Sequence, residues 1–136
     1  MITAVDSSVL IDVLFADHRF GPRSATALRL AVQSGSVIAS DVVWAELAGW
    51  KQAERAIPQA LEHLGVTYMP VSIEAAVVAG TTWARYRAAG GSRDRMVPDF
   101  LVGAHALTQA DRLLTRDRGF YRRYFADLTI VDPTSA

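Results

Sequence analysis

Four acidic residues have the types and spacing that could do chemistry: Asp6, Glu46, Asp99 and Asp117. Asp6 and Asp117 each come just after a short apolar run, at residues 2–5 and 113–115, and such runs predict strands. In a sheet of parallel strands, ligands bind beyond the carboxyl ends of the strands. Acids at two of these ends therefore lie where a binding or catalytic site is expected.

Glu46 and Asp99 stand on predicted helices, and the helical period turns both toward buried faces. At about 100° per residue, Glu46 lies only about 60° from Val43, which begins the apolar stripe of its helix. Asp99 shares its angle with Gly103 and Ala106, on the small-residue face that should pack on the sheet. The helix dipole favours an acid in the first turn, which explains the position of Asp99 along the helix but not its inward direction.

Each acid also has a structural explanation. An aspartate between a strand and a helix is a favoured N-cap, because its side chain accepts hydrogen bonds from first-turn N–H groups. Asp41 follows the second predicted strand in the same way, and we interpret it as a plain cap. The alternative to an enzyme is therefore a non-catalytic RNA- or protein-interaction domain whose acids act as helix caps.

If the four carboxylates converge, they need a counter-charge, since like charges a few ångströms apart cannot all stay ionised. Oxygen ligands favour Mg²⁺ or Mn²⁺, and the absence of cysteine and of a paired-histidine motif argues against zinc. Such sites hydrolyse phosphodiesters. The hydroxyls of Ser8 and Thr115, each two residues from an acid, could orient a carboxylate or a bound water, or could only satisfy turn backbone.

The elements that must position these acids alternate along the chain. Strands separated by helical segments predict parallel pairing with crossover helices, and thus a three-layer α/β/α sandwich with a central, mostly parallel sheet. Strands are expected at residues 2–5, 37–39, 66–71, 113–115 and 128–131. Helical segments are expected near 10–14 and at 22–34, 41–50, up to 63 with a kink or restart at Pro58, 72–89, 98–110 and 118–125.

Composition excludes several classes of protein. The 136 residues are 51% hydrophobic, which fits one packed domain over residues 1–136. The absence of cysteine excludes a disulfide framework. No uncharged apolar run reaches the roughly 18 residues of a membrane span, and the acid-interrupted N-terminal segment does not fit a secretory signal. A soluble, cytoplasmic protein without membrane partners is expected.

Arginines are concentrated in the C-terminal half, although the net charge is zero. Residues 85–123 contain nine arginines and four acids. Guanidinium groups suit phosphates, so a polyanionic partner is one interpretation and a solvated, salt-bridged surface is the other. Arg116, Arg118 and Arg95 are candidates to contact RNA phosphates.

Other conspicuous side chains have simpler explanations. His105 lies about 120° from Asp99 around their shared helix, and we interpret it as a partly buried, hydrogen-bonded histidine. Trp44, Trp50 and Trp83 are expected to fill the core or a subunit interface rather than to stack on a base.

Four segments, in order, resemble the motifs of one nuclease family. They are residues 5–12 (VDSSVLID), 40–47 (SDVVWAEL), 98–106 (PDFLVGAHA) and 113–121 (LLTRDRGFY). This series resembles PIN-domain nucleases, particularly the VapC toxins of bacterial toxin–antitoxin pairs, over essentially the whole chain.

The resemblance implies a PIN-like fold and an Mg²⁺- or Mn²⁺-dependent endoribonuclease, the toxin of a type II toxin–antitoxin system. It also implies a homodimer that a cognate VapB-type antitoxin silences. Asp6 and Asp99 match the principal metal ligands, and Glu46 and Asp117 match the acids that complete or support the site. We expect RNA hydrolysis that leaves 5′-phosphate and 3′-hydroxyl ends.

Overall fold

A five-stranded parallel sheet organises the chain, in a computed structural model that describes residues 1–50, 56–92 and 97–135. The strand order is β3-β2-β1-β4-β5, and every neighbouring pair is parallel. The strands are β1 (Ile2–Val5), β2 (Ser36–Ala39), β3 (Val66–Tyr68), β4 (Arg112–Leu114) and β5 (Ile130–Val131). The predicted α/β/α architecture with a parallel sheet is thus confirmed.

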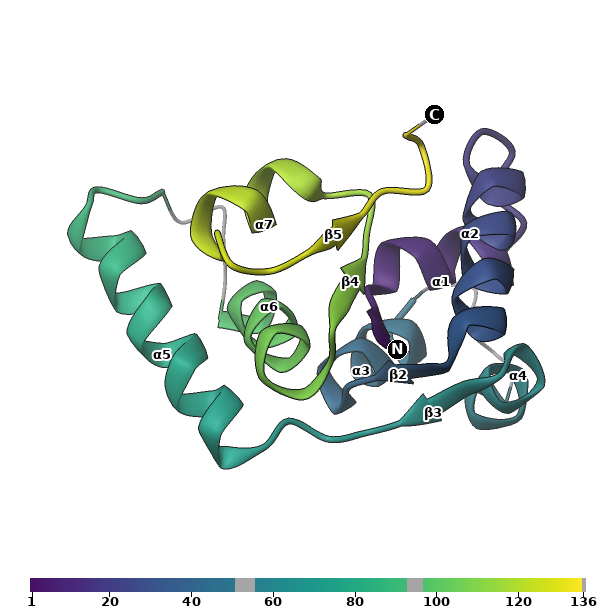
Figure 1. Cartoon of the computed structure of the whole chain (residues 1–136), viewed down its shortest axis with the longest axis horizontal. Coiled ribbons are helices and arrows are strands. Elements are labelled where there is room, and N and C mark those ends of the chain that lie inside the picture. The colour runs from purple at the N-terminus through teal and green to yellow at the C-terminus, as the bar shows by residue number, and fades with distance from the viewer. Residues whose placement is uncertain (51–55, 93–96, 136) are drawn as a thin grey trace.

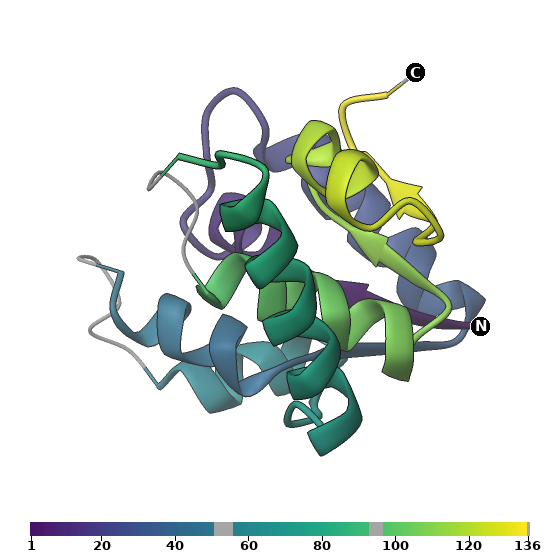
Figure 2. The ribbon, with the colours of Figure 1, turned by 90° about the vertical axis from the view of Figure 1, so that its left-hand side faces the viewer.

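Helices cover both faces of the sheet. They are α1 (Ser7–Leu14), α2 (Gly21–Ser34), α3 (Asp41–Ala48), α4 (Ile57–Leu64), α5 (Ile73–Ala88), α6 (Val97–Gln109) and α7 (Arg118–Tyr124). Helix α2 lies on one side of the strands and α6 on the other (Figure 1). Helix α5 packs on the outer side of α6, as the rotated view shows (Figure 2). Within the described residues, no helix is long and apolar enough to cross a membrane.

Proline explains one predicted boundary that was wrong and one that was right. Strand β3 ends at Tyr68 rather than at residue 71, because Pro70 has no N–H for the ladder and the N–H of Val71 bonds to Asp41 Oδ1. The helix restart expected at Pro58 is confirmed, because α4 begins at Ile57. Pro58 stands in the first turn of this helix, where a missing N–H is tolerated.

The strand register brings distant residues to one edge of the sheet. Val5 pairs with Leu114, and Ala4 pairs with Ile38 in the other neighbouring strand. The N–H of Asp6 then bonds to the carbonyl of Leu114 at 2.9 Å, which extends the ladder by one residue. The residues just after β1, β2 and β4 therefore share one edge, where the sequence predicts the site.

An aromatic cluster ties α6 to α7 behind that edge. The buried ring of Phe100 on α6 makes edge contacts with Phe120 on α7 at 5.2 Å between centroids. Gly103 allows the close approach, because a Cβ there would lie 2.4 Å from the ring of Phe125. This packing fixes α6, which carries Asp99, against the segment that carries Asp117.

Candidate active site

Asp6 is nearly buried and uses its two carboxylate oxygens differently. It is the N-cap of α1, and its Oδ1 accepts a hydrogen bond from the N–H of Ser7 at 2.8 Å. Its Oδ2 accepts a bond from the hydroxyl of Thr115 at 2.8 Å. Asp6 is 7% exposed to solvent. Capping is therefore real at Asp6, but it occupies only one oxygen.

Thr115 links two of the four acids. Its buried hydroxyl donates to Asp6 and accepts a hydrogen bond from the N–H of Asp117 at 3.0 Å. This is the geometry of a hydroxyl that orients a carboxylate, which was one of the two roles considered for it. Ser8 has the other role, because its Oγ accepts the backbone N–H of Arg116 at 3.4 Å.

Capping does not account for Asp117, and the interpretation of Asp41 as a cap was wrong. Asp117 occupies the N-cap position of α7 without a side-chain capping hydrogen bond. Ser40 caps α3 through its Oγ, which accepts from the N–H of Val43 at 3.4 Å. Asp41 instead accepts the N–H of Val71 at 3.0 Å and so joins α3 to the segment after β3.

Glu46 and Asp99 reach the site from α3 and α6. Asp99 is half-buried and stands on the same helix face as the buried Val102 and Ala106, as the helical period predicts. Glu46 stays exposed to solvent, three residues after the buried Val43. It therefore lies at the margin of the buried face of α3 rather than within it.

The four carboxylates share one electrostatic neighbourhood. Burial raises the pKa of Asp6, and the charges of Asp117 and Asp99 add to this, while hydrogen bonds from Thr115 and Ser7 oppose it. Partial desolvation of the Glu46 carboxyl group and the charges of Asp6 and Asp99 together raise its pKa to about 7. Each of the two acids thus feels charge from other members of the group.

Tyr121 lies in the same electrostatic environment as the four acids and was not among the site residues predicted from the sequence. Its ring is buried, and burial raises the pKa of its phenol well above the ordinary value. The charges of all four acids raise it further. A signal was available, since Tyr121 follows Asp117 by four residues on a predicted helix, and such residues share a face.

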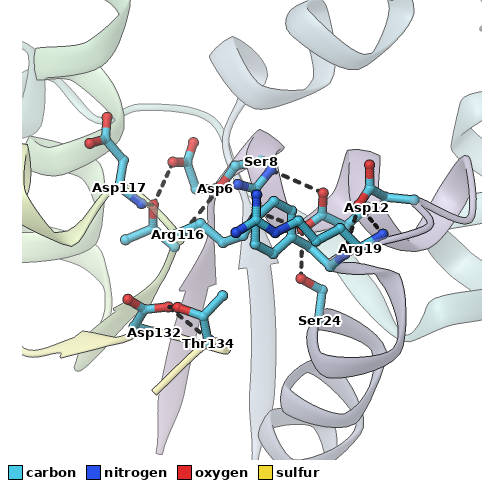
Figure 3. Close-up of polar contacts among 12 residues, drawn as sticks. Asp6, Ser8, Asp12, Arg19, Ser24, Arg116, Asp117, Asp132 and Thr134 are labelled. Carbon is cyan, nitrogen blue, oxygen red and sulfur yellow. Dashed lines mark hydrogen bonds and ion pairs between the residues drawn. The ribbon is translucent and has the colours of Figure 1, made fainter. Parts of the chain in front are cut away.

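Arg116 is held by a carboxylate outside this group. Its Nε and Nη2 bond to the two oxygens of the buried Asp12, at 2.7 and 3.0 Å, and Ser24 also donates to Asp12 at 2.7 Å. The guanidinium lies 4.1 Å from the ring centroid of Phe20. Figure 3 shows Arg116 extending away from Asp6 and Asp117 toward Asp12. The arginine therefore anchors the loop between β4 and α7.

Of the other two candidate arginines, only Arg118 lies within the described residues. Arg118 is exposed, and its Nε lies 3.5 Å from Asp132 while its Nη1 donates to Ser135 at 3.2 Å. Arg95 lies outside the described residues.

The four carboxylates do not form a ready-made metal site in the described part of the chain. Among the described residues, no three Asp, Glu or His side chains come together closely enough to hold a metal. Their donor chemistry nevertheless suits a hard divalent cation, since the groups offer only oxygen, and the charge of Asp99 contributes to the raised pKa of both Asp6 and Glu46. The residues therefore fit Mg²⁺ or Mn²⁺ in the kind of ligand atom that they offer.

His105 and the tryptophans differ in burial and in their hydrogen-bond partners. His105 is buried, its Nε2 lies 2.8 Å from the carbonyl of Met69, and burial lowers its pKa, in agreement with a structural role. Trp44 packs against the core, with its indole nitrogen lacking a partner among the described residues. Trp50 is 41% exposed, which excludes the core and leaves a subunit interface as the other of its two expected places.

The family of the chain follows from its sequence as well as its fold. The sequence model of the PIN domain matches residues 3–126. The chain therefore belongs to the PIN domain family, as its motifs indicated. A search of curated proteins finds no significant match.

Solved structures from toxin–antitoxin complexes share the fold over nearly the full length. A chain of VapBC2 from Rickettsia felis, bound to a promoter DNA fragment, is similar with a TM-score of 0.75 and 18% identity, covering 97% of this chain and 98% of that one. VapBC-1 from nontypeable Haemophilus influenzae gives 0.73 and 16%, with coverages of 99% and 100%. FitAcB from Neisseria gonorrhoeae gives 0.69 and 19%, with both chains fully covered at 100%.

Proposed function

We propose that this protein is an Mg²⁺- or Mn²⁺-dependent endoribonuclease that hydrolyses RNA phosphodiester bonds. One observation carries the proposal: acids from four separate elements meet electrostatically at the carboxyl edge of a parallel sheet, where two of them have raised pKa values. Such clustering of perturbed carboxyl groups is typical of functional sites. Membership of the PIN domain family supports the same reading, since these domains are typically nucleases.

Asp6 and Asp99 would hold the cation, and Glu46 and Asp117 would complete or support its site. When bound, the cation supplies neutralisation of phosphate charge and activation of water. The protein's part is to place the oxygens. Thr115 donates to Asp6, which fixes the orientation of that carboxylate, and it also accepts the N–H of Asp117, which fixes the start of α7.

The biological role we propose is that of the toxin of a type II toxin–antitoxin system. The similar structures come from complexes titled VapBC and FitAB, which supports a VapB-type antitoxin as the partner of this chain. We further propose that residues 1–136 form a single nuclease domain, that the protein is a homodimer, and that it cuts RNA in the cytoplasm.

The non-catalytic alternative treats the acids as helix caps. The capping bond of Asp6 favours it. Asp117 weighs against it, because its side chain makes no capping hydrogen bond although it occupies the capping position.

Cleavage of RNA by the purified protein with Mg²⁺ or Mn²⁺ tests the proposal. Asp99→Asn should abolish cleavage and leave a folded protein, slightly more stable because repulsion is relieved. Asp6→Asn should do the same, although it replaces one of the two oxygens that accept from Ser7 and Thr115, so Asp99→Asn is the cleaner variant. Products should carry 5′-phosphate and 3′-hydroxyl ends.

Asp127→Asn is the matched control, because Asp127 is exposed and lies outside the four acids. It should cut at the rate of the wild type. Undiminished cleavage by both Asp6→Asn and Asp99→Asn would contradict the assignment and favour a domain whose acids only cap helices.

A further inference from the structure

A pocket of about 570 Å³ opens beside the carboxylates, between α1 and the C-terminal end of α3. We propose that it receives one base of a single-stranded RNA substrate, stacked on the indole of Trp50. This inference rests on the proposed nuclease function and adds to it a site that holds a nucleotide next to the scissile phosphate. The pocket is lined by Ser7, Ser8, Ile11, Glu46, Trp50 and Arg116, among others.

The pocket is continuous with the carboxylate group. Glu46 lines it and is also one of the four acids. Ser7, which lines it too, donates its N–H to Asp6 at 2.8 Å and its side chain hydrogen-bonds to Glu46. A strand whose phosphate lies at the carboxylates would therefore place its neighbouring nucleotide in this pocket.

Trp50 presents an aromatic surface to the pocket. Its side chain is 41% exposed, although a tryptophan gains more than most residues from burial. Its N–H bonds to the carbonyl of Leu47 at 3.2 Å, which fixes the backbone just after α3. Phe15 supports the indole, with ring centroids 6.5 Å apart and planes 31° from parallel. A partly exposed indole that lines the pocket and has an aromatic neighbour can serve as a stacking platform.

The chemistry of the walls favours a nucleobase. Trp50 and Ile11 provide apolar contact for a flat ring, while Ser8 and Arg116 provide a polar border. Arg116 cannot swing freely, because Asp12 holds its Nε and Nη2. The volume lies within the roughly 300–1,000 Å³ of small-ligand pockets. Base–aromatic stacking accepts any base, so this pocket would position the strand rather than select its sequence.

The test measures RNA binding by fluorescence anisotropy in the Asp99→Asn background, so that the RNA stays intact. The probes are a labelled single-stranded RNA octamer and versions that lack one base at each position in turn. Trp50→Ala should weaken binding of the complete octamer about tenfold, which corresponds to one lost stacking contact. Trp50→Phe should retain most of the affinity. Trp83→Phe is the matched control and should bind as the parent does.

A double-mutant cycle identifies the stacked base. Removal of one particular base should weaken the parent about as much as Trp50→Ala does, and the two changes together should cost no more than either alone. If Trp50→Ala binds every octamer as tightly as the parent, or if the losses add at every position, the pocket does not hold a base. If Trp50→Ala weakens the binding of a protein partner but not of RNA, the pocket is a peptide site and the proposal is wrong.

Cleavage kinetics separate the two proposals. In the otherwise wild-type protein, Trp50→Ala should raise KM with kcat little changed, since it removes a contact made before the reaction. An unchanged KM contradicts the base pocket alone. An Asp99→Asn parent that binds none of the octamers also contradicts the pocket, and absence of cleavage by the wild type with Mn²⁺ contradicts the nuclease proposal itself.

Discussion

At the scale of single residues, structural and functional roles coexist. Asp6 caps α1 with one oxygen and accepts from Thr115 with the other, so finding a cap does not exclude a ligand. Asp117 occupies a capping position without making the bond. Position in the sequence therefore does not decide between the two roles, whereas the hydrogen bonds and the charges around each carboxylate do.

Glu46 makes stability depend on pH. Its pKa is about 7 in the folded protein against 4.5 ordinarily, so between these values the folded protein holds a proton that the unfolded chain has released. The free energy of unfolding without divalent cation should therefore fall as the pH rises from 4.5 through 7. Urea denaturation across this range measures it.

Glu46→Gln isolates that contribution, because all other titrating groups are common to both proteins. The variant should lose this part of the pH dependence and should be more stable than the wild type at about pH 8, where the wild-type carboxyl is charged. Identical pH profiles for the two proteins would show that Glu46 is not in the repulsive environment described above.

Tyr121 should affect the reaction more than the fold. Its buried phenol lies within the electrostatic reach of all four acids. Tyr121→Phe should slow RNA cleavage about tenfold, which corresponds to losing about 1.4 kcal/mol of interaction between the hydroxyl and the charged site. Tyr124→Phe, in the same helix and the same aromatic cluster, is the control for the ring environment. Equal rates for both variants and the wild type would remove Tyr121 from the site.

At the scale of elements, the ion pair between Asp12 and Arg116 joins α1 to the loop before α7. Asp12 is buried and Arg116 partly so, and Arg116 stands between Thr115 and Asp117. Asp12→Asn should lower the free energy of unfolding by roughly 2 kcal/mol, the scale of one charge-assisted hydrogen bond. It should also slow cleavage, because the loop that carries Asp117 is held less firmly. Urea denaturation and the cleavage assay measure the two effects.

The ion pair of Arg118 and Asp132 is the comparison for that experiment, because the Arg118 side chain is 50% exposed. Arg118→Ala should change the free energy of unfolding by less than about 1 kcal/mol, as is usual for ion pairs in water. If the two substitutions destabilise the protein equally, the bond between Asp12 and Arg116 has no special anchoring role.

The order of elements could be predicted from the sequence better than their ends or their side-chain partners. Alternating strands and helices predict the parallel sheet, and the ends of its strands predict where acids gather. The end of β3 was missed although Pro70 marks it. The sequence also left the core and a subunit interface open for Trp50, and its exposure excludes the core. Arg116 was assigned to phosphate, because nothing in the local sequence indicates that the buried Asp12, about a hundred residues away, is its partner.

At the scale of the whole molecule, α5 has an apolar outer face. Ile73 is 86% exposed and Val77 is 60% exposed, and a Cβ added at Gly80 would meet nothing within 4 Å. Such a face is where the proposed homodimer would form. Val77→Asp should convert the dimer to a monomer in sedimentation experiments without unfolding it, because the side chain is on the surface. A wild type and variant of equal mass would place the dimer contact elsewhere or exclude it.

Calorimetric titration with Mn²⁺ measures whether carboxylates distant in the chain form one site for a divalent cation. We expect saturable binding by the wild type, an increase in thermal stability on binding, and loss of both in Asp99→Asn but not in Asp127→Asn. Absence of saturable binding, or equal binding by wild type and Asp99→Asn, would show that these carboxylates form no such site.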